Sequence, residues 1–144
     1  MKNLILLSVV FFIVACGANK NENNSCPSGI LYKAESRGIY VNIVLNKSTL
    51  TIEKDRNKKN SKTIDLNKND WAQICSIVEK INLKNIKNIK STSEDRFIDK
   101  AAIAELKIEF QDKQYKSNNF DHGNPPAKLK ELIEKILALS EKAQ

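Results

Sequence analysis

The sequence predicts an α+β domain of two layers, in which a mostly antiparallel sheet of element order ββββ-α-ββ-α carries two helices packed on one face. Residues 30–53 and 104–115 alternate apolar and polar side chains, as half-buried strands do. Residues 71–81 and 129–140 repeat apolar side chains at helical spacing. Two layers bury the apolar sides of both kinds of element, whereas the pattern leaves the strand order open.

Two tight turns organise the first three expected strands. Residues 30–34 and 39–45 alternate around a turn at Arg37-Gly38, and the third strand follows a turn at Lys47-Ser48. With two-residue turns, five pairs of apolar residues are expected to lie opposite each other: Ala34–Val41, Tyr32–Ile43, Ile30–Leu45, Leu45–Leu50 and Ile43–Ile52. Because all of these side chains then share one face, we expect an antiparallel meander with one buried side.

Residues 54–62 interrupt the alternation with a run of basic side chains. The run contains Lys54, Arg56, Lys58, Lys59 and Lys62, against the single acid Asp55. It could be a solvated hairpin tip or a contact for an anionic partner. We favour the solvated tip, because no aromatic side chain interleaves with the charges to provide stacking. Ile64 and Leu66 then predict a short fourth strand.

The first helix has a clear start signal. Asn67 can cap it, Asp70 occupies the third helical position, and Leu66 can pack against Trp71 as a hydrophobic staple. The apolar face that follows consists of Trp71, Ile74, Cys75, Val78 and Ile81. This spacing places Trp71 in the core. Residues 83–89 are expected to form a fraying helix end or an ordered loop, and residues 91–99 a polar connection.

A second hairpin and a second helix complete the domain. We expect strands on either side of a turn at Asp112-Lys113, which sets Phe110 opposite Tyr115. Asn124 is the expected cap of the second helix, with Pro125 in its first position. The apolar face of that helix is expected to hold Leu129, Leu132, Ile133, Ile136, Leu137 and Ser140.

The first sixteen residues carry a secretion signal. Lys2 supplies a positive start, residues 4–14 are largely apolar, and small Ala15 precedes Cys16. The apolar run is too short to span a bilayer, which needs about 20 residues. Ile13-Val14-Ala15-Cys16 resembles the lipobox of bacterial lipoproteins. The resemblance implies cleavage after residue 15, lipidation of the Cys16 sulfur and acylation of the new amino terminus.

The anchor implies a location and a domain division. Residues 16–29 are polar and Asn-rich, which is typical of a flexible tether, and residues 30–144 form the expected globular domain. Gly17 follows the lipidated cysteine where lipoproteins retained at the inner membrane carry Asp. The resemblance therefore implies a lipid-anchored protein of the cell envelope, at the outer membrane, facing either the periplasm or the cell surface.

Two cysteines remain once Cys16 is lipidated. Cys26 and Cys75 would lie in a compartment that permits disulfides, and a bridge would fasten the tether to the first helix. Alternatively, Cys75 is a small buried apolar residue and Cys26 is free. The sequence leaves both open, because it does not give the distance between the Cα atoms. One histidine and this cysteine spacing predict no metal site, and no cofactor motif is present.

The charge balance restricts the partners. A formal net charge of +7 suits anionic surfaces, although a lysine-rich solvated surface is the simpler interpretation. The sequence contains no nucleic-acid-binding motif, and we expect no nucleic acid as the partner of an exported chain. We expect the membrane itself, through Cys16, and an envelope protein or an anionic polymer.

Chemistry-bearing residues lie in the expected loops. The lone His122 beside Asp121 is the natural candidate for acid-base catalysis, but turn residues with these side chains also serve local structure. We take as a candidate binding surface Arg37, Arg96, Asp99, Asp121 and His122. The segments Glu35-Ser36-Arg37-Gly38 and Phe120-Asp121-His122-Gly123-Asn124-Pro125-Pro126 resemble those of small envelope lipoproteins of uncharacterised function. That resemblance implies no activity.

Three functions fit these features. The first is a non-enzymatic, membrane-anchored binding or accessory module of the envelope, which the absence of a recognisable catalytic motif favours. The second is a small hydrolase or ligand-processing protein that uses His122 with a carboxylate. The third is an inhibitor of an exported hydrolase that presents a rigid loop.

Overall fold

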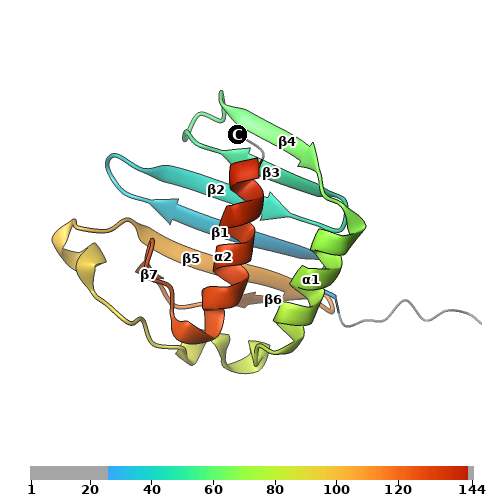
Figure 1. The fold of residues 1–144 in the computed structure, drawn as a ribbon. Coiled ribbons are helices and arrows are strands. Elements are labelled where there is room, and N and C mark those ends of the chain that lie inside the picture. The colour runs from blue at the N-terminus through green and yellow to red at the C-terminus, as the bar shows by residue number, and fades with distance from the viewer. Residues whose placement is uncertain (1–25, 143–144) are drawn as a thin grey trace, which may run out of the picture.

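The computed structural model describes residues 26–142. A largely antiparallel sheet carries both α-helices on the same face, which confirms the expected two-layer α+β fold (Figure 1). The strands are β1 (Gly29–Glu35), β2 (Tyr40–Leu45), β3 (Thr49–Glu53), β4 (Ser61–Asp65), β5 (Ile103–Phe110), β6 (Lys113–Lys116) and β7 (Phe120–Asp121). The helices are α1 (Lys68–Glu79), α2 (Ala127–Lys142) and the 3-10 helices η1 (Leu83–Asn88) and η2 (Asp95–Ile98).

The order of the sheet is β4-β3-β2-β1-β5-β6, and β7 pairs with the start of β5. The central pairing is therefore between β1 and β5, two strands far apart in the chain. Tyr32 lies opposite Leu106 and Ala34 opposite Ala104, so the apolar faces of both strands coincide. The two helices cover this apolar face, and the resulting core is continuous from β3 to α2.

The expected register of the meander is confirmed. Ile30 pairs with Leu45, Tyr32 with Ile43 and Ala34 with Val41. The turn between β2 and β3 is stabilised by the Asn46 side-chain oxygen, which accepts hydrogen bonds from the backbone N–H groups of Ser48 and Thr49 at 2.9 and 2.8 Å.

The expected register of the second hairpin is wrong. The turn lies at Gln111-Asp112, so Phe110 pairs with Lys113, and Tyr115 pairs with Ile108. Gln111 and Asp112 have φ angles of 50° and 57°, a left-handed pair that matches the twist of a two-residue hairpin. The observed partner of each residue lies two positions from the expected partner, so every side chain remains on the expected face of the sheet.

Helix α1 begins as predicted. The Asn67 side chain accepts a hydrogen bond from the Asp70 backbone N–H at 2.8 Å, and Leu66 and Trp71 are both buried. Lys135 of α2 contacts the Asp70 carboxylate at 2.6 Å. This bond, aided by the Asn67 side chain, holds the pKa of Asp70 below its usual range and links the two helices.

Helix α2 begins two residues later than predicted, at Ala127. Asn124 is not its cap, because the Asn124 amide donates to the Ser93 hydroxyl at 2.8 Å and its backbone N–H donates to Asp121. Leu139 is fully buried on this helix, whereas Leu137 is only partly buried.

A disulfide joins Cys26 to Cys75, with the sulfur atoms 2.02 Å and the Cα atoms 4.7 Å apart. It fastens the segment that leads into β1 to the middle of α1.

Cys16 and the rest of the expected signal and tether up to residue 25 lie outside the described residues. None of the helices in residues 26–142 combines the length and hydropathy needed to cross a bilayer.

Candidate functional site

Asp121 is the centre of the candidate site. Its side chain, at the end of β7, is 1% exposed. Its carboxylate accepts hydrogen bonds from the Ser93 hydroxyl, from the backbone N–H groups of Asp95 and Arg96, and from the Arg96 guanidinium at 2.9 Å. Burial raises the pKa of Asp121, but the hydrogen bonds from Ser93 and Arg96 outweigh it and lower the pKa to about 2. The ionised carboxylate therefore fixes η2 against the sheet.

His122 belongs to a different network. Its Nδ1 lies 2.7 Å from the hydroxyl of Tyr32, a fully buried residue in the middle of β1. Burial raises the pKa of Tyr32 and lowers that of His122, which favours a phenol that donates to an unprotonated imidazole nitrogen. The bonds of the Asp121 carboxylate go instead to η2 and the segment before it. The two neighbours in sequence thus form no acid-base pair, and the hydrogen bond that holds the His122 ring comes from the Tyr32 phenol and not from a carboxylate.

The structure brings together only part of the expected binding surface. Arg96 and Asp121 form a buried ion pair, and His122 follows in the chain. Asp99 is exposed at the end of η2, where it adopts a left-handed φ of 56°. Arg37 is exposed in the turn between β1 and β2, and within residues 26–142 no hydrogen bond or ion pair joins it to the other four.

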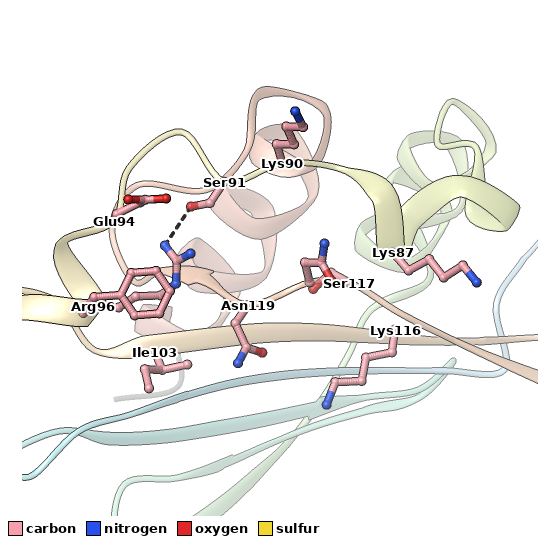
Figure 2. Close-up of a pocket in the computed structure, with 11 residues that line it drawn as sticks. Lys87, Lys90, Ser91, Glu94, Arg96, Ile103, Lys116, Ser117 and Asn119 are labelled. Carbon is pink, nitrogen blue, oxygen red and sulfur yellow. Dashed lines mark hydrogen bonds between the residues drawn. The ribbon is translucent and has the colours of Figure 1, made fainter.

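An open groove of about 860 Å³ lies beside the Asp121 network. We call it the cationic groove. It is lined by Lys87, Lys90, Ser91, Glu94, Arg96, Phe97, Ile103, Lys116, Ser117, Asn118 and Asn119. Figure 2 shows Lys87 and Lys90 on one side, with Lys116 and Asn119 on the other. Four basic side chains and a single carboxylate line this groove, so its electrostatic potential favours anions.

The wall formed by Arg96 is rigid. Its guanidinium donates to the Ser93 carbonyl at 2.6 Å and to the Ser91 hydroxyl at 3.2 Å, besides Asp121. It also lies 4.3 Å from the centre of the Phe97 ring. These contacts hold the η2 side of the groove in place before any ligand arrives, which reduces the entropy cost of binding.

The other cations differ in their availability. Lys116 contacts Glu105 at 2.7 Å, and this carboxylate also contacts Lys107. Burial raises the pKa of Glu105, but the hydrogen bonds from the two lysines lower it further, so Glu105 stays ionised. Lys87 and Lys90 are exposed, and no ion pair engages either of them in the part of the chain that the structure describes. These two lysines are therefore the groove's basic side chains that no described carboxylate neutralises.

Most of these groove residues were missed by the sequence interpretation. Only Arg96 belongs both to the expected surface and to the groove. The Lys- and Asn-rich character of residues 83–90 was the available signal, but these side chains form a site only because β6 and η2 lie opposite them.

Residues 26–142 contain no group of three or more His, Cys, Asp or Glu side chains that is placed to hold a metal ion.

Comparison of the chain with protein-family models, with curated proteins and with solved structures found no match.

Proposed function

We propose that this protein is a membrane-anchored lipoprotein of the bacterial cell envelope that acts as a non-enzymatic binding or accessory module. The cationic groove carries the proposal, because it offers Lys87 and Lys90 to an anionic partner beside a rigid wall. Its partner is an envelope protein or an anionic polymer. The lipobox-like residues ending at Cys16 support the anchor and the location in the envelope.

The geometry around His122 favours binding over hydrolysis. The imidazole Nδ1 is engaged by Tyr32, and the nearest carboxylate in the sequence, Asp121, is bonded to Ser93 and Arg96. A hydrolase would instead need a histidine oriented toward a substrate. A specific turnover that disappears in a folded His122→Ala variant would overturn the proposal and support the hydrolase.

One observation favours an inhibitor as a second candidate. Phe97 and Ile98 are 71% and 62% exposed on η2, the segment that the Asp121 carboxylate fixes. A rigid loop with exposed apolar side chains can occupy a pocket of another protein at low entropic cost. Co-purification of one dominant exported hydrolase with the protein, lost in Phe97→Ser, would support this candidate over a general envelope adaptor.

The groove can be tested by neutralising its available lysines. We expect Lys87→Gln/Lys90→Gln to weaken binding to long-chain polyphosphate or polyglutamate about tenfold at low salt, because two favourable ion pairs are lost. Calorimetric titration of the mature protein measures this affinity. Lys54→Gln/Lys59→Gln removes the same charge from the exposed hairpin tip and should leave the affinity unchanged. Equal losses in both variants would show that net charge, rather than the groove, binds the polymer.

The anchor has a separate test. In bacteria that express the full chain, Cys16→Ser should move nearly all of the protein from the membrane fraction to the soluble fraction, because the acyl chains are lost. Mass spectrometry of the amino-terminal peptide should find the lipid on Cys16 in the unmodified sequence. Ser25→Ala, in the same segment, is the control and should stay with the membrane. Membrane retention of Cys16→Ser without any lipid mass would contradict the anchor.

A further inference from the structure

A second groove, largely apolar, lies at the end of α1. It is open, with a volume of about 400 Å³. Its apolar wall consists of Val78, Ile81, Leu83, Phe110 and Tyr115, and its polar residues are Glu79, Asn82, Lys84 and Gln111. We call it the apolar groove. Its residues come from the end of α1, from the segment that leads into the start of η1, and from the β5–β6 hairpin.

The amino-terminal segment joins the domain beside this groove. Cys26 is bonded to Cys75, and Val78 follows one helical turn later on α1. The Ser28 backbone N–H donates to the Glu109 carbonyl at 2.8 Å, directly before Phe110. Both attachment points of the segment thus neighbour groove residues.

The length of the chain limits how far this end can lie from the anchor. Cys26 lies ten positions after Cys16 in the chain. A chain of that length spans at most about 35 Å when fully extended. A lipid on Cys16 therefore keeps the apolar groove within about one tether length of the bilayer, where a high effective concentration of lipid compensates for weak affinity.

We propose that the apolar groove takes an acyl chain of an anionic bilayer lipid, so that this end of the domain rests on the membrane. The inference extends the proposed function, because it takes the anchor at Cys16 as given. Aliphatic and aromatic side chains supply the apolar contact, and Tyr115 has the amphipathic character that suits a membrane interface. Lys84 lines the groove and Lys113 pairs with Phe110, so both can attract anionic headgroups.

The test separates the groove from the anchor by removing the lipid. The mature chain with Cys16→Ser is mixed with vesicles of phosphatidylglycerol and phosphatidylethanolamine, and bound protein is measured by flotation. We expect detectable binding, weakened about tenfold by Phe110→Ser, because one apolar anchor is lost. Ile39→Ser removes an exposed apolar side chain from the β1–β2 turn, at the other end of β1 from this groove, and should not change the binding. Thermal unfolding of both variants checks that the fold is retained.

A label inside the groove provides a second measurement that needs no core substitution. Lys84 is exposed, so Lys84→Cys can carry an environment-sensitive fluorophore in the Cys16→Ser background. Vesicle lipids brominated on the acyl chain should quench it, whereas the same label at Ile39→Cys should stay unquenched.

Three outcomes would overturn the inference. They are no vesicle binding by the unlipidated chain, equal loss in Phe110→Ser and Ile39→Ser, and no quenching at position 84 in vesicle-bound protein. The last outcome would show that the domain meets the membrane without an acyl chain of the bilayer entering the groove. Failure of the proposed anchor would instead be seen in mass spectrometry of the amino-terminal peptide, as the absence of a lipid mass on Cys16.

Discussion

Replacing both Cys26 and Cys75 by alanine is expected to lower the free energy of unfolding by about 4 kcal/mol. The disulfide closes a loop with a sequence separation of 49 residues, which includes all of β1 to β4 and the cap of α1. In the chain-entropy account, a cross-link over such a loop restricts the unfolded chain by about that amount. The bridge also holds the segment before β1 against α1, so its loss frees the amino-terminal end of the central strand.

Urea unfolding of the mature protein measures this difference. Reductant should destabilise the unmodified protein by a similar amount and should leave the double alanine variant unchanged. This comparison separates the cross-link from the small change in packing at Cys75, which is 5% exposed. A loss below about 1 kcal/mol in both experiments would contradict a stabilising disulfide.

The meander could be predicted from sequence because its information is local. Period-two alternation assigns each side chain to a face, and the short turns fix the register, so the pairs Tyr32–Ile43 and Ile43–Ile52 were correct. The same reasoning misplaced the β5–β6 turn by one position, because several neighbouring polar residues can form a two-residue turn. The left-handed conformations of Gln111 and Asp112 decide between them.

The candidate site was less predictable because its contacts are distant in sequence. His122 reaches Tyr32, 90 positions away, whereas Asp121 reaches Ser93 and Arg96. Asp121 ends β7 and His122 begins the turn that follows, and their side chains join different networks, so these neighbours in sequence were poor candidates for a pair. The pairing of β5 with β1 and the position of η2 place these partners, and neither follows from local periodicity.

The Asp121 network also explains how an irregular segment has a fixed conformation. Residues 91–99 carry no long helix or strand, yet a single carboxylate accepts two of their backbone N–H groups and the Arg96 guanidinium. Because the Asp121 carboxylate satisfies these donors, the segment is held in one conformation in which Phe97 is exposed. The rigidity of the cationic groove and the exposure of η2 therefore have one cause, and a change at Asp121 should affect both.

Asp121→Asn is expected to lower the free energy of unfolding by about 3 kcal/mol near neutral pH, because it leaves the buried Arg96 guanidinium without its counter-ion. The variant should also loosen η2 and weaken polyanion binding in the cationic groove. Asp99→Asn is the matched control, since Asp99 is exposed in the same segment and asparagine tolerates its left-handed conformation. We expect that control to change stability by less than about 0.5 kcal/mol.

The pH dependence identifies the charge as the cause. The pKa of Asp121 is about 2 in the folded protein, below the ordinary value of 3.8. A carboxyl group with a lowered folded pKa stabilises the fold above its unfolded pKa, and that contribution disappears as the pH falls through the folded value. The difference in unfolding free energy between the unmodified protein and Asp121→Asn should therefore be constant above about pH 5 and shrink between about pH 4 and about pH 2.

Comparing the two proteins cancels the acid sensitivity of Asp55, Asp70 and Glu105, whose pKa values are also lowered. A difference that stays constant down to about pH 2 would mean that the asparagine variant is destabilised by its shape or hydrogen bonding, and that the ionised carboxylate is not what holds η2 in place.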